Sequence, residues 1–143
     1  MTGLLDEDEF SRWLKMARRT LDSARGDLAR GDYSWSCFKS HQAAEYAVKA
    51  LLHGVGETTH GHSISNLITK ISAANFSEVL EEAKALDKFY VPTRYPDAWS
   101  EGVPVDYYTE RDATEALMWA EKILGWVVRV WKSLGGGESG GRL

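Results

Sequence analysis

The chain has 143 residues, one cysteine and a formal net charge of −4 at neutral pH. A single cysteine excludes an intramolecular disulfide and any zinc site built from several cysteines, and the acidic balance argues against a protein that coats nucleic acid through charge alone. No apolar run approaches the ~18 residues that a membrane-spanning helix needs, and the acidic N-terminus is unlike a signal peptide. We therefore expect a soluble, cytoplasmic protein without contact to a membrane.

The first predicted helix begins near Asp6 and ends near Arg30. Acidic residues in its first turn suit the positive end of a helix dipole, and Gly31 and Asp32 provide a stop followed by a new cap. Its apolar residues recur at spacings of three and four, as expected for one buried face: Phe10, Trp13, Leu14, Ala17, Leu21, Ala24 and Leu28.

The segment from Trp35 to Leu52 predicts a helix with two different faces. One face is small and apolar and suits a helical core: Cys37, Ala44, Val48 and Leu51. The opposite face mixes aromatic rings with polar groups: Trp35, Phe38, Gln42, Glu45, Tyr46 and Lys49. Because a surface helix buries only one stripe, the second face indicates a subunit interface or a ligand groove.

Two short helices and one long helix are expected in the rest of the chain. Their apolar stripes are Ile64, Leu67, Ile68 and Ile71, then Val79, Ala83, Leu86 and Tyr90, and finally a dense series from about Asp112 to Leu134. The segment 91–111 holds all three prolines and predicts a long loop, which in a compact domain tends to be functional. Residues 135–143 are rich in glycine and predict a flexible tail. The fold class is all-α, with one domain over residues 1–134.

The long loop carries the best candidate for ligand binding. Arg94 offers a planar fork for a phosphate, Tyr95 offers a ring on which a base can stack, and prolines on both sides stiffen the segment. Asp97 lies beside them in the sequence. The alternative is structural, with Arg94 and Asp97 tying the loop to the helices.

Four polar residues of the central helix are further candidates for ligand binding. His41 is either a functional group or a hydrogen-bonded core histidine. Glu45 and Lys49 have the spacing of a helical ion pair, and together with Gln42 on the same face they form either that pair or a polar network between subunits.

Aromatic residues outside the core stripes predict a homodimer. Trp119 and Trp126 of the last helix lie off the centre of its apolar stripe, and with the second face of the central helix they give surplus hydrophobic surface. The interface candidates are Trp35, Phe38, Tyr46, Trp119 and Trp126.

His60 and His62 lack a third ligand of matching spacing, so we expect no metal and no other cofactor, and assign HGHS to a loop and a helix cap.

The chain resembles the HEPN domain family in three sequence segments. They are SHQAAEYAVKALL in the central helix, HS at the start of the next helix, and YVPTRYPDA before the last helix. The resemblance covers the chain from about Phe10 to Trp131. It implies an up-and-down antiparallel bundle of four to five helices, usually a homodimer and often encoded beside a minimal nucleotidyltransferase. It also implies a nucleotide or RNA ligand, since some members bind nucleotides and others are metal-independent ribonuclease toxins.

The ribonuclease members share an arginine followed, after four to six residues, by a histidine. This chain lacks that motif: Arg94 is followed at the required distance by Trp99, Ser100 and Glu101, and none of the four histidines has an arginine five to seven residues before it. We therefore expect a nucleotide- or RNA-binding accessory protein of a toxin–antitoxin-like system rather than an enzyme. Two alternatives remain: a divergent ribonuclease toxin that uses Arg94 with His41 or His62, and a structural dimer without a ligand.

Overall fold

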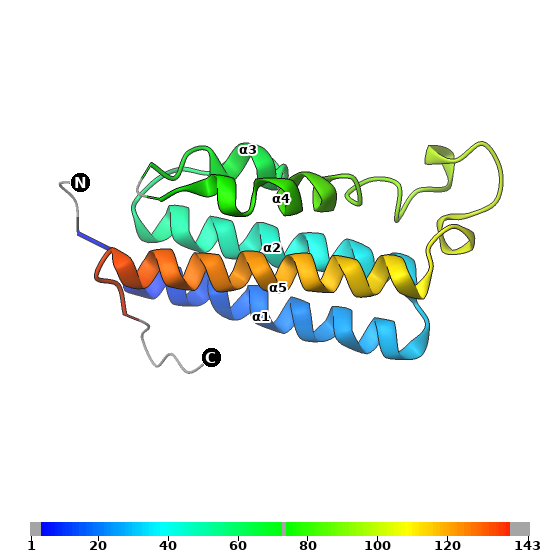
Figure 1. Cartoon of the computed structure of the whole chain (residues 1–143), viewed down its shortest axis with the longest axis horizontal. Coiled ribbons are helices and arrows are strands. Elements are labelled where there is room, and N and C mark those ends of the chain that lie inside the picture. The colour runs from blue at the N-terminus through cyan, green and yellow to red at the C-terminus, as the bar shows by residue number, and fades with distance from the viewer. Residues whose placement is uncertain (1–3, 73, 138–143) are drawn as a thin grey trace.

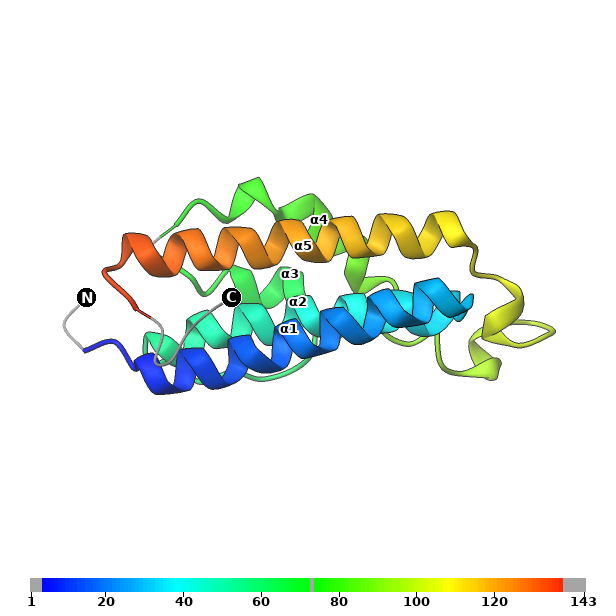
Figure 2. The ribbon, with the colours of Figure 1, turned by 90° about the horizontal axis from the view of Figure 1, so that it is seen from below.

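A computed structural model of the chain describes residues 4–72 and 74–137, and every regular element in these ranges is helical. Three long helices, α1 (Glu7–Arg30), α2 (Tyr33–Gly54) and α5 (Glu110–Ser133), run along the long axis of the molecule (Figures 1 and 2). Two short helices, α3 (Ile64–Ile68) and α4 (Leu80–Asp87), lie side by side against α2 (Figure 1). The chain runs forward along α1 and back along α2, the short helices α3 and α4 are antiparallel because Asp87 at the end of α4 contacts the start of α3, and α5 runs back along the bundle. The predicted all-α, up-and-down bundle is confirmed.

The caps of α1 follow the sequence signals, whereas Asp32, the predicted cap of α2, makes no side-chain capping hydrogen bond. Asp6 accepts a hydrogen bond from the backbone N–H of Glu9 at the start of α1, and Gly31 ends this helix with a φ of 84°. Thr109 and Asp112 form a capping box at the start of α5, in which each side chain accepts a bond from the other residue's backbone N–H. These local contacts fix where the two outer long helices begin.

The α1–α2 pair is the most tightly packed part of the bundle. Small residues of α2 let the helices approach closely, and Ser36 Oγ donates a hydrogen bond to Ala24 O of α1 at 2.8 Å. At the other end of the pair, Gly54 lies under the ring of Trp131 from α5, and that ring stacks on Phe10 of α1 with 4.1 Å between ring centroids. One aromatic stack therefore joins the two outer long helices across the end of α2.

The segment between α4 and α5 extends beyond the end of the bundle (Figure 1). It contains the short 3₁₀ turns η2 (Pro96–Ala98) and η3 (Pro104–Asp106), whereas a further turn, η1 (Phe76–Glu78), precedes α4. Trp99 organises the extension, because its ring stacks on Tyr107 at 3.9 Å and its Nε1 donates to Pro92 O at 2.8 Å. The long loop predicted from its prolines is thus an ordered turn structure.

The first residues of the expected tail fold back onto α5. The expected tail begins at residue 135, yet Gly136 N donates to Trp131 O and Trp131 Nε1 donates to Gly137 O at 2.7 Å, so the chain folds back over Trp131. Residues 138–143 of that tail lie outside the described residues.

No helix in the described part of the chain has the length and apolar character needed to cross a bilayer.

Candidate functional site

Glu45 and Lys49, on the polar face of α2, are buried, and the loop before α3 contacts Glu45 through His62. Glu45 is 2% exposed and accepts a hydrogen bond from Lys49 Nζ at 2.9 Å. The same carboxylate lies 3.1 Å from Nδ1 of His62, whose side chain is 52% exposed. A buried carboxylate is costly without partners, and here one lysine and one histidine supply them. The predicted Glu45–Lys49 pair is thus present, within a single chain, and His62 joins it.

Asp87, the last residue of α4, holds the start of α3 in place. Its carboxylate accepts hydrogen bonds from the backbone N–H groups of Ile64 at 2.8 Å and Ser65 at 3.0 Å, and from the hydroxyls of Ser63 and Ser65. His41 Nε2 lies 3.3 Å from the same carboxylate. Burial alone would raise the pKa of Asp87, but the hydrogen bonds from His41, Ser65 and Ile64 lower it from 3.8 to about 2. Asp87 is therefore ionised and fixes the chain directly after His62.

The guanidinium of Arg94 lies among three aromatic rings. Its guanidinium carbon is 4.2 Å from the ring centroid of Phe38, 4.6 Å from that of Tyr90 and 4.8 Å from that of Tyr95. Its Nε and Nη2 donate to Tyr90 O at 2.9 and 2.7 Å, and Nη1 lies 3.4 Å from the Tyr95 hydroxyl. A guanidinium has five N–H groups. Three of them are directed at these oxygens, so two remain for a ligand.

Tyr90 joins the two halves of the site. Its ring stacks on His62 with centroids 4.7 Å apart and an interplanar angle of 17°, lies 5.2 Å from the ring of His41, and has the guanidinium carbon of Arg94 at 4.6 Å from its centroid. The sequence periodicity assigns Tyr90 to an apolar core stripe and gives Asp87 no role. Their spacing to Arg94, three and then four residues, is the available signal, because it places all three on one side of a helical segment.

The structure brings most of the predicted binding residues together. His41 and Arg94 contact the ring of Tyr90, and Glu45 and Lys49 are linked to that ring through His62. Gln42 Oε1 lies 3.2 Å from His41 Nδ1, and Tyr95 is 47% exposed at the edge of the cluster. We call this set, with His62 and Asp87, the Tyr90 cluster. Asp97 is not part of it. Asp97 is exposed at η2 and makes no hydrogen bond or ion pair with any residue described in the structure.

His41 is fully buried, as expected for a hydrogen-bonded core histidine. It contacts Asp87 and Gln42 and stays behind the ring of Tyr90, so a ligand in solvent does not reach it directly. Of the histidines, His62 is the one that the Tyr90 cluster presents to solvent. No three histidine, cysteine, aspartate or glutamate side chains within the described ranges are arranged to hold a metal ion.

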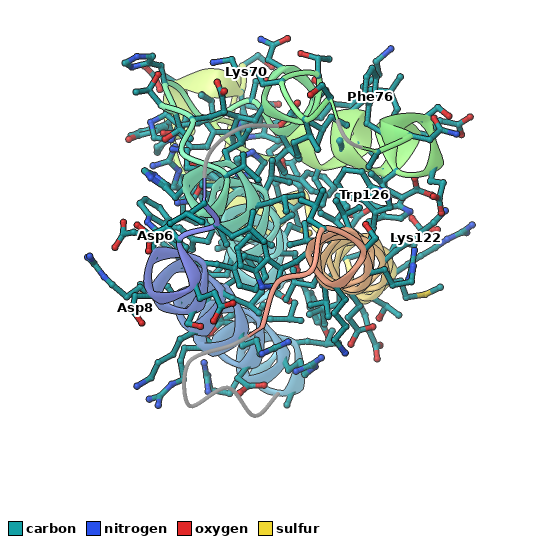
Figure 3. The ribbon with its side chains drawn as sticks, turned by 90° about the vertical axis from the view of Figure 1, so that its left-hand side faces the viewer. Asp6, Asp8, Lys70, Phe76, Lys122 and Trp126 are labelled. Atoms are coloured by element: carbon teal, nitrogen blue, oxygen red, sulfur yellow. The ribbon has the colours of Figure 1, made fainter. Side chains whose placement is uncertain are left out.

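The aromatic residues predicted at a dimer interface fall into two groups. Trp35 is 44% exposed, and Phe38, Tyr46 and Trp119 are half-buried, so each still presents ring surface to solvent. Trp126 is 1% exposed and lies among the helices (Figure 3), so its prediction as an interface residue is wrong. Its position off the centre of the apolar stripe is explained by a core that is wider around α5 than one stripe.

The fold and the site define an all-helical bundle domain with a polar and aromatic site built on its second helix. The HEPN domain model matches residues 10–131, and the chain belongs to this family. The chain is also similar to the solved structure of TT1696 from Thermus thermophilus, with 42% identity, a TM-score of 0.83, and coverage of 86% of this chain and 98% of that one.

Two further relatives extend the comparison. The solved structure of ST0689, an archaeal HEPN homologue, is 44% identical with a TM-score of 0.72, and the match covers 85% of this chain and 97% of that one. A protein of Methanocaldococcus jannaschii called "Putative toxin MJ1304" is 28% identical over 123 residues, which are 78% of this chain and 81% of that protein.

Proposed function

We propose that this HEPN domain binds a nucleotide or RNA at the Tyr90 cluster. The observation that carries the proposal is the state of Arg94, which is held among three rings and keeps two N–H groups that no described residue accepts. A guanidinium held in this way suits a phosphate oxygen pair, since its planar fork is already oriented. The exposed ring of Tyr95, next to Arg94, and the half-exposed imidazole of His62, stacked on Tyr90, are surfaces for a base.

The test is binding of AMP, measured by calorimetry, and of a fluorescein-labelled ten-nucleotide poly(A) RNA, measured by anisotropy. We expect Arg94→Lys to weaken both nearly as much as Arg94→Ala, because a point charge replaces the fork. Tyr95→Ala should cost about 1–3 kcal/mol of binding free energy if a base stacks on this ring. Affinity for the RNA should fall as salt rises, because phosphate contacts release counterions.

The control is Arg129→Ala on α5, which removes the same charge from a side chain that is 65% exposed. Because Arg94 also donates to Tyr90 O, its variants change the loop as well as the proposed contact, and melting temperatures are measured in parallel. Lowered melting temperatures in the Arg94 variants with unchanged binding would leave Arg94 a purely structural residue. No binding of either ligand by the wild type would leave a structural module without a ligand.

A second function is favoured by the His62–Glu45 contact. With Nδ1 at the buried carboxylate, Nε2 of His62 makes no hydrogen bond to the described residues and can exchange protons with a ligand near Arg94. The similarity to the relative named as a toxin is consistent with a slow, metal-independent ribonuclease. Incubation of the pure protein with total RNA in EDTA tests this. Cleavage that is lost in His62→Gln and Arg94→Ala supports it, and cleavage that needs magnesium contradicts it.

As a protein partner we propose a minimal nucleotidyltransferase, in a system of the toxin–antitoxin type. The support for this partner is the family resemblance of the chain. Co-expression with a minimal nucleotidyltransferase encoded beside the gene, followed by affinity purification through a tag on one chain, tests it. A complex that survives gel filtration is the expected result, and separate elution of the two proteins would contradict the proposal.

A further inference from the structure

We propose that the groove between α1 and α2 is a second nucleotide subsite next to the Tyr90 cluster, so that the ligand is a single-stranded oligonucleotide rather than a mononucleotide. The inference rests on the proposed function. The groove has a volume of about 380 Å³. Its lining comes from both helices: Met16, Arg19, Thr20 and Ser23 of α1, and Phe38, Lys39, Gln42 and Tyr46 of α2.

The charge of the groove suits a phosphate. Its two charged lining residues, Arg19 and Lys39, are both cations, in a chain whose net charge is −4. Lys39 Nζ lies 2.9 Å from the buried carboxylate of Asp27 and donates to Ser23 Oγ at 3.0 Å, so much of its charge is already balanced. Arg19 is exposed and forms no ion pair in the described part of the chain. We therefore assign the phosphate contact to Arg19, with Lys39 as a weaker second cation.

The walls of the groove suit a base. Phe38 and Tyr46 are half-buried and come from the same face of α2, and Met16 is 50% exposed on the facing helix. Trp13 supports Tyr46 from the α1 side, with ring centroids 6.1 Å apart. Aromatic faces accept any base by stacking, and a methionine adapts to the shape of a ring. The groove thus offers a stacking surface and a cation within the space of one nucleotide.

Two side chains belong to both the groove and the Tyr90 cluster. Phe38 lines the groove and carries the guanidinium of Arg94 at 4.2 Å from its ring centroid. Gln42 lines the groove and contacts His41 at 3.2 Å. A strand with one phosphate at Arg94 therefore has its neighbouring nucleotide at the groove. A mononucleotide fills only one of the two subsites, whereas an oligonucleotide fills both at once.

The experiment measures binding of the labelled ten-nucleotide RNA and its competition by AMP, for the wild type, Arg19→Ala, Tyr46→Ala and Tyr46→Phe. The wild type should bind the RNA at least tenfold more tightly than AMP. Arg19→Ala and Tyr46→Ala should weaken RNA binding at least fivefold and change AMP binding less than twofold, and Tyr46→Phe should keep RNA binding because the ring remains. Removing one phosphate contact to a single strand should also lower the slope of log affinity against log salt by about 0.7.

The matched control is Arg129→Ala, on α5. Seen along the bundle, α1 and α2 lie on one side and α5 on the other (Figure 3). Equal effects of Arg19→Ala and Arg129→Ala, or equal affinities for AMP and the RNA, would overturn the second subsite and leave binding at Arg94 intact. Binding of neither ligand would overturn both proposals. A wild-type dimer that Tyr46→Ala converts to a monomer would place a second copy of the chain in the groove and overturn the oligonucleotide.

Discussion

Replacing Asp87 with asparagine tests how the Tyr90 cluster is held together. The substitution keeps the size of the side chain and removes its charge. An amide also presents N–H donors, which would face the donors of Ile64 and Ser65. We expect the start of α3 to loosen, and with it the backbone that follows His62.

The pKa of Asp87 gives the magnitude. Its lowering from 3.8 to about 2, at about 1.36 kcal/mol for each pH unit, corresponds to about 2.4 kcal/mol of stabilisation. The side chain is 19% exposed, so solvent screens this contribution only slightly. Asp87→Asn should therefore lower the free energy of unfolding at pH 7 by about 2–3 kcal/mol and the melting temperature by roughly 5–10 °C.

The pH dependence follows from the direction of the shift. Because the folded pKa is below the unfolded one, the stabilisation is fully present above about pH 4 and is lost as the pH falls from 3.8 towards 2. Urea unfolding of the wild type and the variant at a series of pH values measures it. Asp97→Asn is the control, since Asp97 is exposed, and its effect should stay within about 0.5 kcal/mol. A wild-type–variant difference that is the same at pH 7 and pH 2.5 would refute the reasoning.

Three further predictions concern the core, the cysteine and the assembly. Gly54→Ala should destabilise the fold by about 1–3 kcal/mol in thermal unfolding, because the added Cβ would lie 2.5 Å from Trp131. Gly125→Ala, whose added Cβ would lie 3.5 Å from its nearest neighbour, should instead stabilise the fold by about 0.5–1 kcal/mol. Burial, with a smaller effect of a nearby carboxylate, raises the pKa of Cys37 to about 12, so its thiol should react with Ellman's reagent only after unfolding. Sedimentation should give twice the chain mass, and Trp35→Ala should weaken that dimer; a monomer at high micromolar concentration would contradict the predicted homodimer.

The helices were predictable from the sequence because each has a strong local signal. The apolar stripes of α1 and α5 keep their period over many turns, and Gly31 marks the end of α1. The start of α5 is Glu110 rather than about Asp112, because Thr109 and Asp112 form a capping box that the apolar period does not show. The two faces of α2 were also predictable, since Glu45 and Lys49 lie opposite its small apolar stripe. What the period does not show is what covers the second face.

The site was only partly predictable because its organising contacts span long sequence distances. Asp87 contacts His41 across 46 positions and Ser65 across 22. A carboxylate at the end of a short helix has no local signature that names such partners. Trp126 shows the converse limit: a residue off the centre of an apolar stripe is buried or exposed according to how many neighbours surround its helix, and α5 has neighbours on more than one side.

The structural and functional interpretations of Arg94 are compatible. Its bonds to Tyr90 O tie the loop to the end of α4, as the structural interpretation requires. The same bonds, with the contacts to the rings of Phe38 and Tyr95, hold the guanidinium in place, so a ligand need not immobilise a flexible side chain, whose ordering would otherwise cost about 0.5–1.5 kcal/mol. If Arg94 binds a phosphate as proposed, the contacts within the chain already hold its side chain in place, and a variant that frees the side chain should lose affinity even where the positive charge is kept.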